Sequence, residues 1–198
     1  MIDIILNLVI FAVTAILMIR FSRKNGRWTT EQIRVALRFF TCQSNVLCAV
    51  SAVVMAAALL SGNIPEWVWI LKYIGTAGVT VTMVTVFLIL APKVGKGWAN
   101  RLLTGPDFFM HLLTPILAIV TFCVFEKRGM VFPQCLWGLL PIVLYGPLYL
   151  YKVLRAPEGK GWNDFYGFNT NGKWPVYLAV MLTGTFLICL GFMALQNG

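Results

Sequence analysis

Six long apolar runs constrain the fold of this chain more than any other feature of its sequence. They cover residues 3–20, 38–61, 67–91, 108–125, 133–153 and 174–195. A run of roughly 17 to 25 residues is long enough to cross about 30 Å of hydrocarbon as a helix. Because 59% of the 198 residues are hydrophobic and only 12% are charged, the composition is typical of membrane proteins. We predict an all-α polytopic membrane protein in which residues 1–198 form a single domain of six transmembrane helices.

The net charge of +9 indicates a membrane orientation and not a nucleic-acid partner. The first, third and fifth loops hold thirteen basic residues, whereas the second and fourth loops hold two. Cytoplasmic loops are enriched in Lys and Arg, so both termini should face the outer side. We expect a multi-pass protein of the plasma membrane if the source is bacterial, and of an endomembrane if it is eukaryotic. The thirteen residues are Arg20, Arg23, Lys24, Arg27, Arg34, Arg38, Lys93, Lys96, Arg101, Lys152, Arg155, Lys160 and Lys173.

Five cysteines lie inside the apolar runs or at their ends. None belongs to a CxxC motif or to a Cys and His spacing that suits a metal. A buried free cysteine behaves as a small apolar residue. We therefore expect these side chains to pack in the core, and we expect neither a disulfide, a metal nor a cofactor. They are Cys42, Cys48, Cys123, Cys135 and Cys189.

Small residues and prolines mark two of the runs. The third run contains Gly75, Thr76 and Gly78, which let helix backbones approach closely. We interpret them as packing residues in preference to ligand contacts. The fifth run contains Pro141 and Pro147, which should kink its helix and open space beside the second and fourth helices.

The segment before the second run matches a helix start. Thr29 is followed three residues later by Gln32, which is the spacing of a capping box. We predict a helix that begins near Thr30 and continues without a break into the second run. Two or three of its turns would then project from the bilayer.

A stripe of polar side chains lies on the second run, in an otherwise apolar helix. Thr41, Ser44, Asn45 and Cys48 recur at spacings of three and four residues, so they share one helix face. Polar groups inside a membrane are costly and usually functional. The stripe is therefore the first candidate for a site.

His111 is the sole histidine, and it should lie at the same depth as Thr41. The second and fourth helices both run outward from the basic side, and each residue follows its helix start by about one turn, or on the order of 5 Å. A neutral imidazole within hydrogen-bond reach activates a hydroxyl as a nucleophile. We predict Thr41 and His111 as a catalytic pair. The alternative is a histidine in a structural role and a threonine bonded to its own helix backbone.

Four more side chains are candidates for supporting or substrate-binding roles. Asn45 and Ser44 either donate to an oxyanion or bridge helices. Asp107, one turn before His111, either orients the imidazole or complements the free N–H groups of a helix start. Arg38 either receives an anionic headgroup or a fatty carboxylate, or extends to lipid phosphates by default.

Short motifs on these helices resemble the androgen-induced-gene and androgen-dependent TFPI-regulating protein family, whose members are six-helix membrane threonine hydrolases, and its bacterial relatives. The resemblance spans most of the chain. It implies hydrolysis of fatty acid esters of hydroxy fatty acids, with Thr41 as the nucleophile and His111 as the base. The motifs are Phe40-Thr41-Cys42-Gln43-Ser44-Asn45, His111-Leu112-Leu113-Thr114-Pro115, Tyr145-Gly146-Pro147-Leu148-Tyr149 and, more weakly, Trp162-Asn163-Asp164-Phe165-Tyr166-Gly167-Phe168.

The expected activity is therefore intramembrane hydrolysis of a lipid or fatty acyl ester, without a cofactor. The fifth loop, with Trp162, Asp164 and Tyr166, either covers the site or forms an interfacial aromatic belt. One alternative is a non-enzymatic protein with a polar pocket that binds lipids or transports small solutes. Another is a structural subunit of a larger complex. The sequence leaves the oligomeric state open.

Overall fold

All six predicted transmembrane helices are present in the computed structural model, which describes residues 1–24 and 27–198. The only strands among the described residues, β1 (Arg23–Lys24) and β2 (Arg27–Trp28), form a short antiparallel ladder. The protein is therefore an all-α integral membrane protein that crosses the bilayer several times. The spans are Ile2–Phe21, Phe40–Ser61, Glu66–Val94, Pro106–Phe125, Phe132–Leu154 and Trp174–Asn197.

Three spans are continuous α-helices and three are built from several pieces. The continuous ones are α1 (Ile2–Phe21), α3 (Phe40–Ser61) and α11 (Trp174–Asn197). The third span joins α4 (Glu66–Thr85), the π-helix η1 (Val86–Leu90) and α5 (Ala91–Val94). The fourth joins α7 (Pro106–Phe108), the π-helix η2 (Phe109–Leu113), α8 (Thr114–Val120) and the π-helix η3 (Thr121–Phe125). The fifth joins α9 (Phe132–Cys135), the 3₁₀-helix η4 (Leu136–Leu139) and α10 (Leu140–Leu154). Short helices α2 (Thr30–Ala36), α6 (Trp98–Leu102) and η5 (Thr170–Gly172) lie in the loops.

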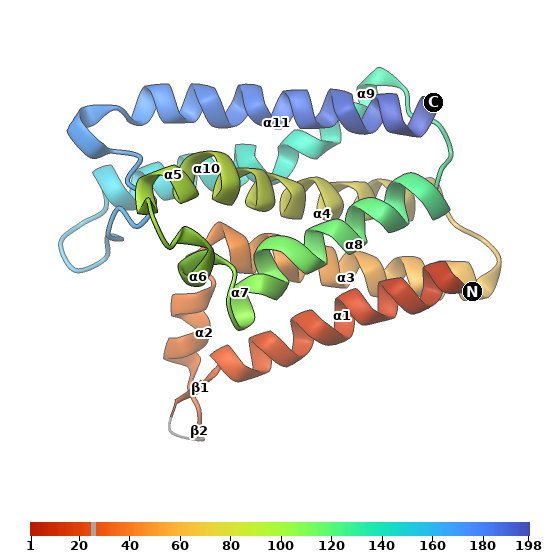
Figure 1. Ribbon diagram of the computed structural model, residues 1–198, viewed down its shortest axis with the longest axis horizontal. Helices are drawn as coiled ribbons and strands as arrows, with labels where there is room; N and C mark the ends of the chain where they lie inside the picture. Colours follow the sequence, from red (N-terminus) through yellow and green to blue (C-terminus); the bar gives the residue numbers. More distant parts are fainter. Residues whose placement is uncertain (25–26) are drawn as a thin grey trace.

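The spans form a bundle with two distinct ends (Figure 1). Both termini and α9 lie at one end, on the right of the view, and α2, α6 and α7 lie at the other. The second group belongs to the loops that are richest in basic residues. Their cytoplasmic orientation stays a prediction from the sequence.

Helix α4 passes through the middle of the bundle and is buried along most of its length. At Gly75, an added Cβ atom would lie 2.9 Å from the Cys48 Cα atom of α3, closer than side chains tolerate. Thr76 and Thr80 donate their hydroxyl hydrogens to the carbonyls four residues earlier. These contacts support the predicted packing role of the small residues. The five cysteines are all free, and only Cys123 is partly exposed, as expected for core residues.

Two of the π-helices have a local cause in the sequence. Pro115 lacks the N–H that would bond the His111 carbonyl within η2, and its ring crowds that carbonyl. Pro92 stands in the same relation to Leu88 of η1. A wider helical turn relieves the conflict, and such turns are frequent at functional sites. In the fifth span, the helix has 3₁₀ geometry at η4, which ends two residues before Pro141.

The prediction of one unbroken helix from Thr30 into the second span is wrong. The start at Thr30 is correct, but Thr29 makes no side-chain capping bond and α2 ends at Ala36. The backbone is extended at Phe39 and α3 begins at the next residue. Distant phenols satisfy the polar groups around this break, as described below. The break between α2 and α3 is stabilised by these tertiary contacts, because the sequence at the break contains no glycine or proline.

Candidate active site

Thr41 and His111 line one cavity of about 430 Å³, which we call the dyad cavity. Thr41 comes from the first turn of α3, and His111 comes from η2. The two side chains that the sequence predicts at matching depth therefore border a common space. Gln32 of α2 and Tyr166 of the 155–173 loop line the same cavity, so it lies at the end of the bundle where these elements gather.

Asn45 connects the two helices that carry Thr41 and His111. It is completely buried, and its Nδ2 group donates hydrogen bonds to the Thr41 carbonyl at 2.9 Å and to the Met110 carbonyl at 3.2 Å. Met110 directly precedes His111. Because an amide group has two hydrogens and both are used, Asn45 has none left for an oxyanion. Of its two predicted roles, the structure supports the bridge.

Ser44 and Arg38 do not line the dyad cavity. The Ser44 hydroxyl lies 2.9 Å from the Thr82 hydroxyl of α4 and donates to the Thr41 carbonyl at 3.1 Å. It therefore bridges helices. Arg38 lies in the turn between α2 and α3 with an exposed side chain. Its carbonyl accepts a hydrogen bond from the Tyr145 hydroxyl at 2.8 Å, so its backbone fixes the start of α3.

Asp107 shares the dyad cavity with His111. It is half-buried in α7, the single turn that leads into η2. An acidic residue at this position faces the free N–H groups of a helix start, where the helix dipole favours it. It also lies one turn before His111 on the same wall. The geometry is compatible with both predicted roles of this carboxylate.

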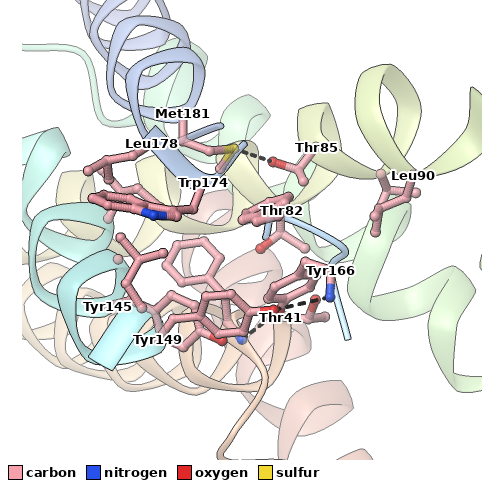
Figure 2. Close-up of a pocket in the computed structure, with 16 residues that line it drawn as sticks. Thr41, Thr82, Thr85, Leu90, Tyr145, Tyr149, Tyr166, Trp174, Leu178 and Met181 are labelled. Atoms are coloured by element: carbon pink, nitrogen blue, oxygen red, sulfur yellow. Dashed lines mark hydrogen bonds between the residues drawn. The ribbon is translucent and has the colours of Figure 1, made fainter. Parts of the chain in front are cut away.

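Thr41 also borders a second, narrower cavity of about 50 Å³, which we call the apolar slot (Figure 2). Its walls come from α3, α4, α10 and α11, with Ile142, Leu178 and Met181 among the apolar side chains. Figure 2 shows Met181 and Leu178 on one side and Thr41 beside the tyrosines on the other. Thr41 therefore lies where the dyad cavity, which has several polar residues on a mostly apolar wall, meets the apolar slot.

The 155–173 loop covers this part of the molecule. Its Phe165 and Tyr166 line the dyad cavity, as the covering interpretation of this loop requires. Asp164 holds the loop in place by accepting hydrogen bonds from the Tyr149 hydroxyl at 2.6 Å and from the Asn169 amide at 2.8 Å. Although partial burial raises the pKa of the Asp164 carboxyl, these hydrogen bonds outweigh it and hold that pKa below its ordinary value.

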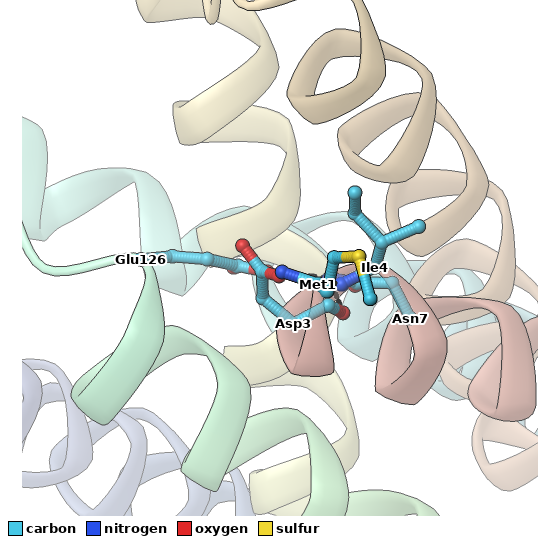
Figure 3. Close-up of polar contacts among 5 residues, drawn as sticks. All are labelled: Met1, Asp3, Ile4, Asn7 and Glu126. Carbon is cyan, nitrogen blue, oxygen red and sulfur yellow. Dashed lines mark hydrogen bonds and ion pairs between the residues drawn. The ribbon is translucent and has the colours of Figure 1, made fainter.

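A second polar cluster, which was not predicted from the sequence, lies at the opposite end of the bundle. Lys72 of α4 is completely buried and donates to Asn7 Oδ1 at 2.5 Å. Asn7 of α1 donates in turn to Glu126 Oε1 at 2.6 Å (Figure 3). The indole N–H of Trp69 bonds the Glu126 carbonyl at 2.8 Å. Burial raises the pKa of the Glu126 carboxyl, against the opposing effects of Lys72 and Asn7. A lysine inside an apolar run was the available signal.

No protein-family model, curated protein or solved structure matches this chain. The resemblance to the androgen-induced-gene family therefore stays a prediction from short motifs. Any functional assignment has to stand on the geometry of the dyad cavity and the chemistry of its side chains.

Proposed function

We propose that this protein is an intramembrane hydrolase of lipid esters, of the fatty acid ester of hydroxy fatty acid type. Thr41 is the nucleophile and His111 is the base. The observation that carries the proposal is that these two side chains, 70 positions apart in the sequence, line one cavity. The Asn45 side chain links the Thr41 carbonyl to the carbonyl of Met110, the residue before His111.

The reaction proceeds in two steps. The Thr41 hydroxyl oxygen attacks the ester carbonyl while His111 takes the hydroxyl proton. The tetrahedral intermediate expels the alkoxide, which receives that proton from His111, and the acyl group remains on Thr41. Water then attacks the acyl-threonine with His111 again as base, and the fatty acid leaves as Thr41 regains its proton.

The surroundings of Thr41 suit an ester with long apolar chains. The methylene groups next to the ester on one chain contact Ile142 and Met181 in the apolar slot, and the rest of that chain extends beyond it. The ester group lies at the junction of the two cavities, and the other part of the molecule enters the dyad cavity and extends out of it. Asp107, on the wall beside His111, stabilises the positive charge of the imidazole while the imidazole carries the proton.

Hydrolysis in proteoliposomes tests this proposal. The substrate is a fatty acid ester of a hydroxy fatty acid, and the readout is free fatty acid by mass spectrometry. Thr41→Ala and His111→Ala should each lower the rate by about 10³-fold or more, since removal of one catalytic group leaves little turnover. Thr185→Ala is the matched control, because Thr185 is a buried threonine of α11 that bonds only its own helix backbone in the described contacts. Hydrolysis that survives both alanine variants would refute the proposal.

A second candidate function is transport of a small solute, and the buried Lys72 and Glu126 favour it. Charged side chains inside a membrane often lie on the paths of ions or solutes. Solute flux in the same proteoliposomes separates the two candidates. The hydrolase proposal expects ester cleavage without flux, whereas transport expects flux that disappears in Lys72→Met and persists in Thr41→Ala.

A further inference from the structure

We infer that Tyr166 supplies the hydrogen bond that stabilises the oxyanion formed when Thr41 attacks the ester, an assignment that rests on the hydrolase proposed above. Tyr166 borders both the dyad cavity and the apolar slot. Thr41 and Leu90 are the other residues that border both, and Leu90 has no polar side-chain atom. Tyr166 is thus the one side-chain donor among the described residues that shares this junction with Thr41.

The Tyr166 hydroxyl oxygen is bonded to the start of the helix that carries Thr41. It accepts the Phe40 N–H at 2.9 Å (Figure 2). Helix α3 has 22 residues, and the amides of its first turn carry the positive end of its dipole. A hydroxyl that accepts such a bond becomes a stronger donor, because hydrogen bonds in a chain polarise one another. The positive end of the helix dipole therefore polarises the Tyr166 hydroxyl and strengthens the hydrogen bond that it donates to the reacting carbonyl.

The phenol keeps its hydrogen at neutral pH. Burial raises the pKa of Tyr166 to about 12, even though the neighbouring backbone amides lower it. A neutral O–H group is what an oxyanion needs from a donor. The hydrogen bond strengthens as the carbonyl oxygen gains charge and weakens when the intermediate collapses. The hydrogen stays on Tyr166 throughout, and no proton has to be replaced between turnovers.

The position of Tyr166 is fixed before substrate arrives. Its backbone N–H donates to the Tyr149 hydroxyl at 3.3 Å, and that hydroxyl donates to Asp164. Lys93, at the end of the third span, donates to the Tyr166 carbonyl at 3.0 Å. A donor held in place in this way costs little reorganisation during the reaction, which is the general requirement for oxyanion stabilisation.

Tyr166→Phe and Tyr145→Phe form a matched pair for the test. Each variant removes one phenol hydroxyl from the start of α3, since Tyr145 donates to the Arg38 carbonyl. Tyr145 lines the apolar slot but not the dyad cavity. Both changes disturb the same helix start, but only one removes the inferred donor.

The measurement is kcat and KM for ester hydrolysis in proteoliposomes, with Thr41→Ala run alongside. Tyr166→Phe should lower kcat by about 10²- to 10³-fold, the usual effect of removing one oxyanion donor, and leave KM nearly unchanged. Tyr145→Phe also changes the wall of the apolar slot, so it should lower kcat as well, but at least about tenfold less than Tyr166→Phe does.

Three results would overturn the inference, and they differ in what they say of the hydrolase itself. If kcat falls equally in both phenylalanine variants, Tyr166 only holds the helix start, and the hydrolase proposal stands. If Tyr166→Phe raises KM and leaves kcat unchanged, the Tyr166 hydroxyl binds substrate without stabilising the oxyanion, and the hydrolase proposal again stands. If Thr41→Ala retains full hydrolysis, both proposals fail together.

Discussion

The two ends of the bundle both bury polar side chains, but they do so in different ways. Asn7 of the first span bonds both to Lys72 of the third span and to Glu126, which directly follows the fourth span. No cavity among those described is lined by these three residues. Thr41 and His111 line a cavity of about 430 Å³. The first group is a closed cluster, in which the hydrogen bonds between side chains run among its own members and, among its described side-chain atoms, only Glu126 Oε2 lacks a partner. The second group faces a space that a second molecule can occupy.

This difference separates residues that hold the fold from residues available for chemistry. Removing one member of a closed cluster leaves its partner buried without compensation, which is strongly destabilising. A hydroxyl on a cavity wall contributes less to the fold, because water can replace its contacts. Substitutions at the two ends should therefore affect different measurements.

The largest expected effect is on activity at the cavity end. Thr41→Val keeps the side-chain shape and removes the nucleophile, so ester hydrolysis should fall by about 10³-fold or more. The thermal midpoint in detergent should stay close to that of the unmodified protein. Thr76→Val is the counterpart on α4, where the hydroxyl bonds the Lys72 carbonyl. Thr76→Val should retain activity. Loss of activity in both valine variants would mean that the two groups of polar residues do not differ in their roles.

Next in size is a loss of stability at the closed end. Lys72→Met leaves Asn7 Oδ1 and Glu126 without their cation, and unfolding should become easier by roughly 3 to 5 kcal/mol at pH 8. The folded-state pKa of Glu126 is raised, so its ionised form opposes folding above that pKa. Lowering the pH through this pKa protonates the carboxyl and should restore part of the loss. Chemical unfolding at pH 8 and at about pH 4, which lies below the ordinary pKa of a glutamate, measures both effects, and a cost that grows at the lower pH would contradict this account.

Asn45 should affect both measurements, since it belongs to the fold and supports the cavity. Asn45→Ala leaves the Thr41 and Met110 carbonyls without their donor, at a cost of about 1 to 3 kcal/mol. Hydrolysis should also fall, because α3 and η2 lose their link beside the pair. Asn163→Ala, at an exposed asparagine, is the control. Full activity in a destabilised Asn45→Ala protein would show that the link does not position the pair.

The smallest effects concern packing in the middle of the bundle. Gly75→Ala forces α3 and α4 apart and should cost roughly 1 to 3 kcal/mol. Gly184 of α11 has open space where a Cβ atom would lie, so Gly184→Ala should instead stabilise the protein by about 0.5 to 1 kcal/mol. Thermal unfolding of both variants in one detergent gives the comparison. Equal shifts of the thermal midpoint in the same direction would mean that the close contact at Gly75 does not contribute to stability.

Features with a local cause were predictable from the sequence. The six spans follow from run length and apolar composition, and the close packing at Gly75 follows from small residues. Pro92 and Pro115 could also have predicted the wide turns before them. Thr41 and His111 were predicted to lie at the same depth because the rise per residue of a helix is constant.

Features that depend on distant partners were not predictable. The break before α3 is held by phenols of Tyr145 and Tyr166, more than 100 residues along the chain. Lys72 is visible as a lysine in an apolar run, but its partner Asn7 was not predictable because it is 65 residues away. Asn45 had two open roles until the carbonyls that it bonds were known. In each case the local sequence identifies a polar group but does not predict its hydrogen-bond partner.

Covalent labelling of Thr41 tests the central claim most directly. The purified protein is treated in lipid with a fluorophosphonate probe, which reacts with activated hydroxyl groups, and the modified peptide is located by tandem mass spectrometry. We expect a single adduct on Thr41 that is lost in Thr41→Ala and His111→Ala, while both variants remain monodisperse. Labelling that persists unchanged in both variants, or an adduct at another residue, would contradict the assignment of Thr41 and His111 as the catalytic pair.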